Sequence, residues 1–274
     1  MSSLRNLCSR RLWYDSINVL TGIIAVIASF ITIVGIGLDD VFDGTSWWMR
    51  CIIMLDIFLV ILITTAIVKI ILSSRQKVLK IRGIKVTIKK GDIFQSQGWK
   101  LIPFNEFYDT EVNDVVIARN SLNGKYILEH VSNITALRER ISQEKNIRIV
   151  GKRTTNGVSF PLGHIIGYNG YMLLAFSHFK NNQAKLSHLE YELCLRNMWH
   201  EISRVYANQP ISIPLLGSGI TRFEDISEVN ETHLLQSILV SLKNSTAQIN
   251  QPITIILTKE TINRINLYDI NKLF

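Results

Sequence analysis

Residues 84–93 read IKVTIKKGDI, and residues 211–220 read ISIPLLGSGI. Each stretch begins like a strand, with alternating or continuous apolar residues, and ends in a turn that contains glycine. In α/β sheets ligands gather beyond the carboxyl ends of the strands, and a Gly-x-Gly turn there lets backbone N–H groups approach phosphate oxygens. The Asp92 carboxylate can accept a hydrogen bond from a base amino group. The two turns therefore supply these candidate binding residues: Asp92, Ile93, Leu216, Gly217, Ser218, Gly219 and Ile220.

The sequence from residue 84 to residue 274 predicts one α/β domain with a well-buried core. Short apolar runs alternate with amphipathic helices, and such alternation indicates a sheet covered by helices on both faces. Besides residues 84–90, strands are expected at 99–104, 115–118, 171–176, 211–216 and 252–257. Helices are expected at 133–145, 185–208 and 230–245.

The sequence before this domain, residues 1–83, predicts a membrane anchor followed by a basic linker. Two uncharged or nearly uncharged runs, at about 16–37 and 51–72, are each long enough to cross a hydrocarbon core of about 30 Å as a helix. The alternative for the first run is a signal peptide, but the apolar part of such a peptide is only about 7–15 residues long. A hairpin of two transmembrane helices in the cell membrane is the favoured interpretation.

The distribution of charge predicts the orientation of this hairpin. Positive residues remain on the cytoplasmic side, and Lys and Arg flank the two runs while Asp residues fill the connector. Both chain termini are therefore expected in the cytoplasm, with Trp47 and Trp48 at the outer interface. The basic stretch 69–90 is expected to be a solvated linker that is attracted to anionic lipid headgroups. The charges are Arg5, Arg10 and Arg11 before the first run, Asp39, Asp40 and Asp43 in the connector, and Lys69, Arg75, Lys77, Lys80, Arg82 and Lys85 behind the second run.

Two features of the predicted hairpin leave alternatives open. Thr21, Ala25 and Ser29 form a small-residue stripe that either packs the two helices of one chain or joins copies of the chain. Asp56 is a carboxylate inside the second run. It either reaches the nearby interface and its water, or takes part in an intersubunit contact or a pore.

The sequence offers no signature of a metal centre or a catalytic group. Its cysteines, Cys8, Cys51 and Cys194, lie far apart and are expected to be buried and inert, and its six histidines form no metal-binding pattern. Ser218 does not complete the nucleophile motif G-x-S-x-G, because Leu216 takes the place of the first glycine. The net charge of +8 indicates an acidic partner such as a membrane surface, a nucleic acid or a nucleotide.

Together the two motifs of residues 84–93 and 211–220 resemble the macro domain, a module that binds ADP-ribose and its relatives. The resemblance implies a mixed sheet sandwiched by helices, with Asp92 and Ile93 at the adenine and residues 217–220 around the diphosphate. The other phosphate loop of that family corresponds to the stretch VVIARNSLNGKYI, with Asn120, Ser121, Leu122, Asn123 and Gly124 as its best candidates. This stretch lacks the polyglycine run and the Asn-Ala-Ala-Asn segment of many macro domains. The departure favours a binding protein over a hydrolase.

A two-span anchor followed by such a domain resembles the effector subunits of type II Thoeris antiphage systems. The phrases IPFNEFYDT, NSLNGKYI and INLYDI (residues 265–270) are also similar to this group. The resemblance implies that a partner TIR-domain enzyme makes an ADP-ribose conjugate of histidine. It further implies that the effector binds this signal, forms homo-oligomers, and disrupts membrane lipid so that the cell dies. It implies no cofactor, no nucleic-acid partner and no catalytic residue.

Two alternatives to the effector remain at this stage. One is a membrane-tethered hydrolase that removes ADP-ribose from proteins or small molecules. The other is a membrane-bound scaffold whose basic linker recruits lipid.

Overall fold

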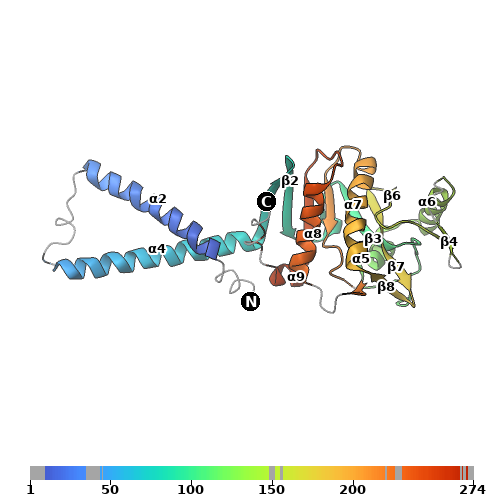
Figure 1. Ribbon diagram of the computed structural model, residues 1–274, viewed down its shortest axis with the longest axis horizontal. Helices are drawn as coiled ribbons and strands as arrows, with labels where there is room; N and C mark the ends of the chain where they lie inside the picture. The colour runs from blue at the N-terminus through green and yellow to red at the C-terminus, as the bar shows by residue number, and fades with distance from the viewer. Residues whose placement is uncertain are drawn as a thin grey trace. The chain divides into compact units, whose positions relative to one another are not determined.

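The computed structural model describes residues 10–34, 44, 46–147, 152–154, 157–219, 221–225, 230–265, 267 and 270 (Figure 1). Contacts between Cα atoms divide the chain into an N-terminal unit that ends at Gln76 and a second unit that runs from Lys77 to Ile265. Each unit is described by itself. Arg5 and the charges of the connector, Asp39, Asp40 and Asp43, lie outside the described residues, whereas Arg10 and Arg11 belong to the first helix.

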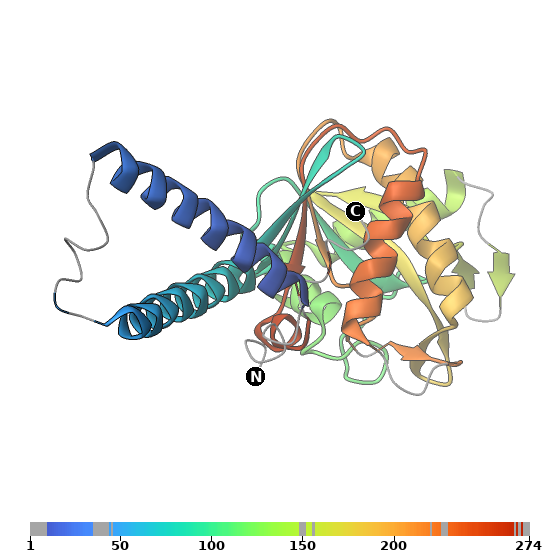
Figure 2. The ribbon, with the colours of Figure 1, turned by 60° about the vertical axis from the view of Figure 1, so that its left-hand side comes forward.

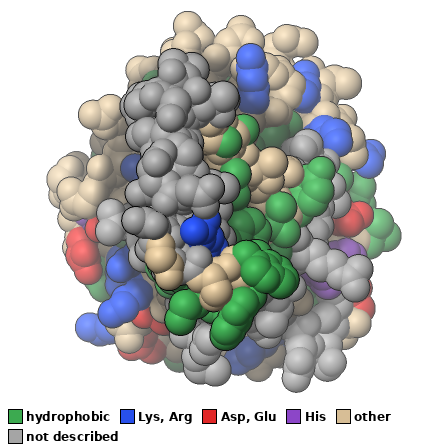
Figure 3. All heavy atoms as spheres, turned by 90° about the vertical axis from the view of Figure 1, so that its left-hand side faces the viewer, with side chains coloured by type: hydrophobic (Ala, Val, Ile, Leu, Met, Phe, Trp, Pro, Cys, Tyr) green, Lys and Arg blue, Asp and Glu red, His purple; other side chains and the backbone are tan. Residues whose placement is uncertain are grey.

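The described part of the N-terminal unit contains two long helices, α2 (Arg10–Val34) and α4 (Trp47–Arg75), which pack against each other. Their apolar side chains are mostly exposed, as in Leu55 at 63% and Val60 at 62%, and Figure 3 shows hydrophobic side chains open at the surface. In a water-soluble domain such side chains would be buried. The described part of α4 thus presents a largely apolar surface.

Among the described residues, one helical stretch is long and apolar enough to cross a membrane, Trp47–Val68. This stretch contains most of the second predicted span, whereas the apolar stretch within the first predicted span, Ser16–Ala25, is shorter. Thr21 and Ala25 of the small-residue stripe are exposed, and Cys51 is exposed as well, contrary to the expectation of a buried thiol. Cys194 is buried as expected, and burial raises the pKa of its thiol.

The second unit contains a nine-stranded mixed sheet in the order β1-β2-β11-β9-β3-β7-β8-β10, with β6 also pairing with β7. Five successive neighbours, β2, β11, β9, β3 and β7, run parallel, while β6 and β8 pair antiparallel with β7. A separate pair, β4 (Lys152–Thr154) and β5 (Gly157–Ser159), lies outside this sheet. The strands of the sheet are β1 (Gln76–Ile81), β2 (Ile84–Lys90), β3 (Trp99–Asn105), β6 (Ile165–Tyr168), β7 (Tyr171–Lys180), β8 (Gln183–Leu186), β9 (Ile211–Pro214), β10 (Arg222–Phe223) and β11 (Ile253–Leu257).

Helices cover both faces of this sheet, as the sequence predicted. Side chains alternate between the two faces of a strand. On β7, Leu173 and Ala175 belong to the core cluster that includes Leu137 of α6, whereas Phe176 contacts Tyr191 of α7 with ring centroids 6.0 Å apart. Figure 2 shows α7 and α8 side by side over one face. The helices are α5 (Leu122–Lys125), α6 (Ile134–Ile147), α7 (His188–Val205), α8 (Glu231–Asn244) and α9 (Lys259–Arg264), with a 3-10 turn η1 (Ile93–Gln95) and a π-helix η2 (Tyr126–His130).

Three sequence predictions of local structure are wrong. Residues 115–118 form turns rather than a strand, because the Asn113 side chain accepts hydrogen bonds from the backbone N–H groups of Val115 and Val116 at 2.9 and 2.8 Å. The basic stretch 69–90 is not a linker, since α4 continues to Arg75 and β1 and β2 follow it. Residues 185–186 belong to β8, and α7 begins only after Ser187, which forms a capping box with Glu190.

Helix α8 provides a matched test of the core. Ile238 is 0% exposed and Val240 is 37% exposed on the same helix. We expect Ile238→Ala to lower the free energy of unfolding by about 2–5 kcal/mol, because it leaves a cavity. Val240→Ala should change it by less than about 0.5 kcal/mol. Denaturant titration of the detergent-solubilised protein, followed by tryptophan fluorescence, measures both, and equal losses would contradict this assignment of the core.

Candidate functional site

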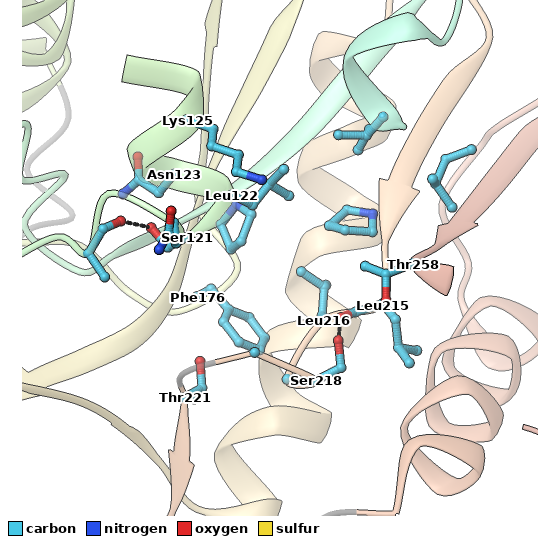
Figure 4. A pocket seen from close by; sticks show the side chains of 18 of the residues that line it. Ser121, Leu122, Asn123, Lys125, Phe176, Leu215, Leu216, Ser218, Thr221 and Thr258 are labelled. Carbon is cyan, nitrogen blue, oxygen red and sulfur yellow. Dashed lines mark hydrogen bonds between the residues drawn. The ribbon is translucent and has the colours of Figure 1, made fainter. Parts of the chain in front are cut away.

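A cavity of about 870 Å³ lies beyond the carboxyl ends of the five parallel strands. Each strand contributes to its wall at or just after its last residues, as in Asp92 after β2, Leu215 after β9 and Thr258 after β11. Figure 4 shows Ser121, Leu122 and Lys125 from one segment, with Leu215, Ser218 and Thr258 across the cavity from them. The sheet topology therefore gathers residues from distant parts of the sequence around one space.

The turn after β2 is held in a fixed shape. The Gly91 N–H donates to the Leu257 carbonyl at 3.1 Å, which extends the pairing of β2 with β11 by one residue. Asp92 Oδ1 accepts a hydrogen bond from the Phe94 N–H at 3.0 Å, and thereby caps the 3-10 turn that begins at Ile93. Ile93 is buried and Asp92 is exposed. One carboxylate oxygen is thus used for the fold, and Asp92 is also one of the residues that line the cavity.

The loop after β9 presents its backbone to the cavity. Residues Leu215 to Gly219 all line it. The buried Tyr191 hydroxyl lies 3.2 Å from the Leu216 carbonyl and 3.3 Å from the Leu234 carbonyl, and it can donate its one hydrogen to either of them. Burial raises the pKa of Tyr191 well above its ordinary value, so this hydroxyl remains protonated and ties the loop to α7 and α8.

Gly217 is required in this loop for two reasons. Its φ is +85°, a conformation that side chains disfavour. A Cβ atom there would lie 3.2 Å from the Phe223 ring and 3.3 Å from Leu234. The Ser218 hydroxyl donates to the Leu215 carbonyl at 2.7 Å, so it closes the turn and has no histidine partner such as a nucleophile would need.

The segment 118–130 forms the opposite wall. Ser121 caps α5, since its hydroxyl accepts from the Gly124 N–H at 2.9 Å and donates to the Ala118 carbonyl at 2.6 Å. Gly124 lies so close to this carbonyl that a Cβ atom would be 2.2 Å from it. Within the part of the chain that the structure describes, Asn123 Oδ1 and the Tyr126 hydroxyl are buried without a hydrogen-bond partner. Asn123 lines the cavity, so its oxygen is available to a ligand or to water, whereas Tyr126 does not belong to the lining.

The charges that line the cavity nearly balance. The described cations are Lys125, Lys259 and Arg264, and the described carboxylates are Asp92, Glu129, Glu231 and Glu260. Arg264 is bound to Glu231 at 2.7 Å. An anionic ligand would therefore rely on backbone N–H groups as much as on side-chain charge. The described residues contain no cluster of three His, Cys, Asp or Glu that could hold a metal ion.

Most of the residues proposed from the sequence lie around this cavity. Gly124 does not line the cavity itself, but its close approach to the Ala118 carbonyl fixes the conformation of the segment that does. Ile220 lies outside the described residues. His178 does not line the cavity; its Nδ1 lies 3.0 Å from a Glu106 carboxylate oxygen and its Nε2 lies 3.3 Å from a Glu190 carboxylate oxygen. The predicted residues that line the cavity are Asp92, Ile93, Asn120, Ser121, Leu122, Asn123, Leu216, Gly217, Ser218 and Gly219.

Sequence reasoning missed the contributions of α9, of Phe94 and His130, of Asn105 at the end of β3, and of Ser177 in the last half of β7. A signal existed for Thr258, which directly follows the predicted strand 252–257. A polar residue at that place belongs to the same sheet edge as the glycine turns.

This chain is similar to known proteins in sequence and in fold. A family model described as the macro domain of Thoeris protein ThsA matches residues 86–258. Thoeris protein ThsA of Bacillus amyloliquefaciens (strain Y2) is 40% identical over 209 residues, which cover 71% of this chain and 69% of that protein. Among solved structures, the Oceanobacillus iheyensis macrodomain with ADP aligns with a TM-score of 0.46 at 15% identity, covering 72% of this chain and 96% of its own. A mutant of that macrodomain aligns with a TM-score of 0.47 at 17% identity, covering 72% and 97%.

The fold is thus a macro-domain-like α/β fold with a mixed sheet. The chain belongs to the Thoeris ThsA macro-domain family. Of the phrases that resemble type II effectors, residues 265–270 lie only partly within the described residues.

The loop after β9 offers a test with a built-in control. Gly217→Ala places a side chain in the left-handed region and against Phe223, and we expect it to lower the free energy of unfolding by about 1–2 kcal/mol. Gly219→Ala meets nothing within 4 Å and should change it by less than about 0.5 kcal/mol. Thermal melting of both variants in detergent measures the difference. Equal midpoints would show that the loop does not need its glycine at position 217.

Proposed function

We propose that this protein is a membrane-anchored effector of antiphage defence that binds an ADP-ribose-derived signal in its macro domain. The observation that carries the proposal is that the Asp92 turn and the Gly217–Gly219 turn line the same cavity. Its volume of about 870 Å³ lies within the range of about 300–1,000 Å³ that small-molecule sites occupy. Membership of the Thoeris ThsA family supports the same class of ligand.

In this proposal the two turns bind opposite parts of the ligand's nucleotide. The Asp92 carboxylate accepts a hydrogen bond from the adenine amino group. Backbone N–H groups of residues 217–220 bind the diphosphate, and residues 120–124 contribute the other phosphate loop. A nearly balanced set of side-chain charges agrees with recognition through backbone dipoles rather than through an arginine cluster.

The anchor is the second part of the proposal. Residues 1–83 would hold the protein in the cell membrane through two spans, at about 16–37 and 51–72, with both termini in the cytoplasm. Residues 84–274 would form the ligand-binding domain, with β1 added at the edge of its sheet. The length and composition of Trp47–Val68 support one of these spans.

The proposed activity is a shift of population rather than a chemical step. A partner TIR-domain enzyme would make the signal, of the histidine–ADP-ribose type. The protein would have an active and an inactive conformation, and a ligand that binds the active conformation more tightly raises its population. To raise the active fraction from about 1% to about 99%, the binding free energies of the two conformations must differ by about 5.5 kcal/mol. The populated state would form homo-oligomers that disrupt membrane lipid and kill the infected cell.

Asp92→Asn tests the adenine contact without removing the cap of the 3-10 turn, because Asn and Asp cap equally well. The new amide NH₂ cannot accept from the adenine amino group. We expect affinity for ADP-ribose to fall about tenfold or more, as measured by calorimetry on the detergent-solubilised chain. Glu192→Gln, an exposed site on α7 outside the cavity lining, should leave affinity unchanged.

The same preparations also test the alternative of a hydrolase. Chromatography of ADP-ribose conjugates incubated with the protein should recover them intact. Multiple turnovers would reject the effector in favour of a membrane-tethered hydrolase, and absence of any binding would favour a scaffold.

Cell fractionation tests the anchor. We expect the full chain to stay in the membrane pellet after extraction with alkaline carbonate, since an apolar helix remains in the bilayer. A chain that begins at Lys77 lacks α2 and α4 and should be found in the supernatant. Release of the full chain by carbonate would argue against a spanning helix.

A further inference from the structure

The hairpin of β1 and β2 carries positive charge and no negative charge. Its strands are joined by Arg82 and Gly83, whose φ angles of +52° and +83° fit the type I′ turn of a two-residue hairpin. The Arg82 guanidinium donates to the Ala247 carbonyl at 3.1 Å, so the tip of the hairpin is attached to the loop after α8. Residues 76–90 contain no Asp or Glu, and their basic residues are Lys77, Lys80, Arg82, Lys85, Lys89 and Lys90.

The two faces of this hairpin differ in burial. One face is apolar and buried, and it consists of Leu79, Ile81, Ile84, Val86 and Ile88. The other face is exposed, and we call it the basic face. On the neighbouring strand β11, Thr254 pairs with Thr87, so this strand adds a hydroxyl beside the basic face and no carboxylate. The residues of the basic face are Val78, Lys80, Lys85 and Lys89.

The lysines of the basic face are not neutralised by the fold. Because Ile81 and Ile84 flank the two-residue turn, Lys80 lies opposite Lys85 on the paired strand. Like charges directly opposite each other destabilise a strand pair. In the part of the chain that the structure describes, no carboxylate forms an ion pair with Lys80, Lys85 or Lys89. An anionic partner outside the described residues would relieve this repulsion.

Protection of the sheet edge explains only part of the basic face. Edge strands often carry lysine, which discourages pairing with another chain. Strand β1 is an edge of the sheet, so this reason accounts for Lys80. Strand β2 lies between β1 and β11, and its two exposed lysines, Lys85 and Lys89, protect no edge. Their presence on this face needs another reason.

The chain connects the basic face directly to the proposed anchor. The apolar stretch of α4 ends at Val68, and β1 begins at Gln76 after α4 has continued to Arg75. At the rise of an α-helix this interval spans about 12 Å. Lipid headgroups extend about 5–8 Å beyond the hydrocarbon core, and their charge acts over about 8 Å more at physiological salt. The hairpin therefore begins within electrostatic reach of the headgroups.

We propose that the basic face is a docking surface for the anionic headgroups of the membrane that holds α4. Headgroup phosphates bind the ammonium groups of Lys80, Lys85 and Lys89 and remove the repulsion between the two strands. The loop contact of Arg82 keeps the hairpin in place, so the three lysines meet the lipid as one surface. This inference rests on the anchor of the proposed function and is independent of its ligand.

The test is lysine footprinting of the full chain in vesicles. The vesicles consist of phosphatidylcholine alone or with added phosphatidylglycerol, and a membrane-impermeant reagent acetylates exposed amines, which mass spectrometry then quantifies. We expect Lys80, Lys85 and Lys89 to react at least about fivefold more slowly with phosphatidylglycerol present, because one lysine near such a surface contributes about that factor. Lys180 and Lys243 are exposed outside the basic face and should react equally in both vesicles.

A charge-reversed pair of variants separates docking from a general effect of the lipid. In Lys85→Glu/Lys89→Glu the basic face loses its attraction, and we expect Lys80 to react at the same rate in both vesicles. Lys180→Glu/Lys243→Glu changes the net charge by the same amount and should leave Lys80 protected. All four positions are exposed, and thermal midpoints of the variants verify their folding.

The other outcomes overturn the inference in distinguishable ways. Equal acetylation of the basic face in both vesicles, with the parent chain retained after carbonate, would reject the docking surface and leave the anchor intact. Release of the parent chain from the vesicles would reject the anchor and the docking surface together. Protection by an added DNA duplex in phosphatidylcholine vesicles, without protection by phosphatidylglycerol, would assign the basic face to a nucleic acid instead.

Discussion

The site depends on the parallel pairing of β11 with β2 on one side and β9 on the other. Leu257 pairs with Lys90, and Ile256 pairs with Pro214. The residues that follow these strands therefore leave the sheet at one edge, and the backbone bond from Gly91 to Leu257 extends the register to the cavity itself. A slip by one residue would move a turn by about 3.3 Å and turn each side chain of the strand to the other face. Neither the Asp92 turn nor the Gly217 loop could then take its present place.

The walls of the cavity achieve their shape mainly through backbone geometry. Gly217 has a positive φ, and Gly124 lies against the Ala118 carbonyl where no side chain fits. The hydroxyls of Ser121 and Ser218 are used to close turns rather than to react. A cavity wall built in this way has a shape that depends on the backbone conformation of its turns.

The N-terminal unit follows a different physical rule from the domain. In the domain, apolar side chains such as Ile238 are removed from water by the helices and the sheet. On α4, apolar side chains such as Leu55 remain exposed over the length of the helix, and the helix has no polar face to turn toward water. The hydrophobic effect therefore requires another apolar partner for this surface. In the proposed function a bilayer would supply this partner. The chain passes from α4 directly into β1.

The amino-acid sequence by itself determined the apolar helical run, the α/β class, the strands predicted at 84–90, 99–104 and 252–257, and the two glycine turns, because these depend on local periodicity and on residue type. It did not reveal that residues 115–118 are turns, since the Asn113 side chain competes there with strand pairing. Nor did it reveal β1. The charged residues of β1 are typical of a linker, and only the pairing with β2 in the tertiary structure makes this segment a strand. Tertiary structure alone decided that α9, Phe94 and His130 join the cavity. Their place follows from the order of strands in the sheet and from side-chain contacts between segments far apart in the chain, which no local pattern encodes.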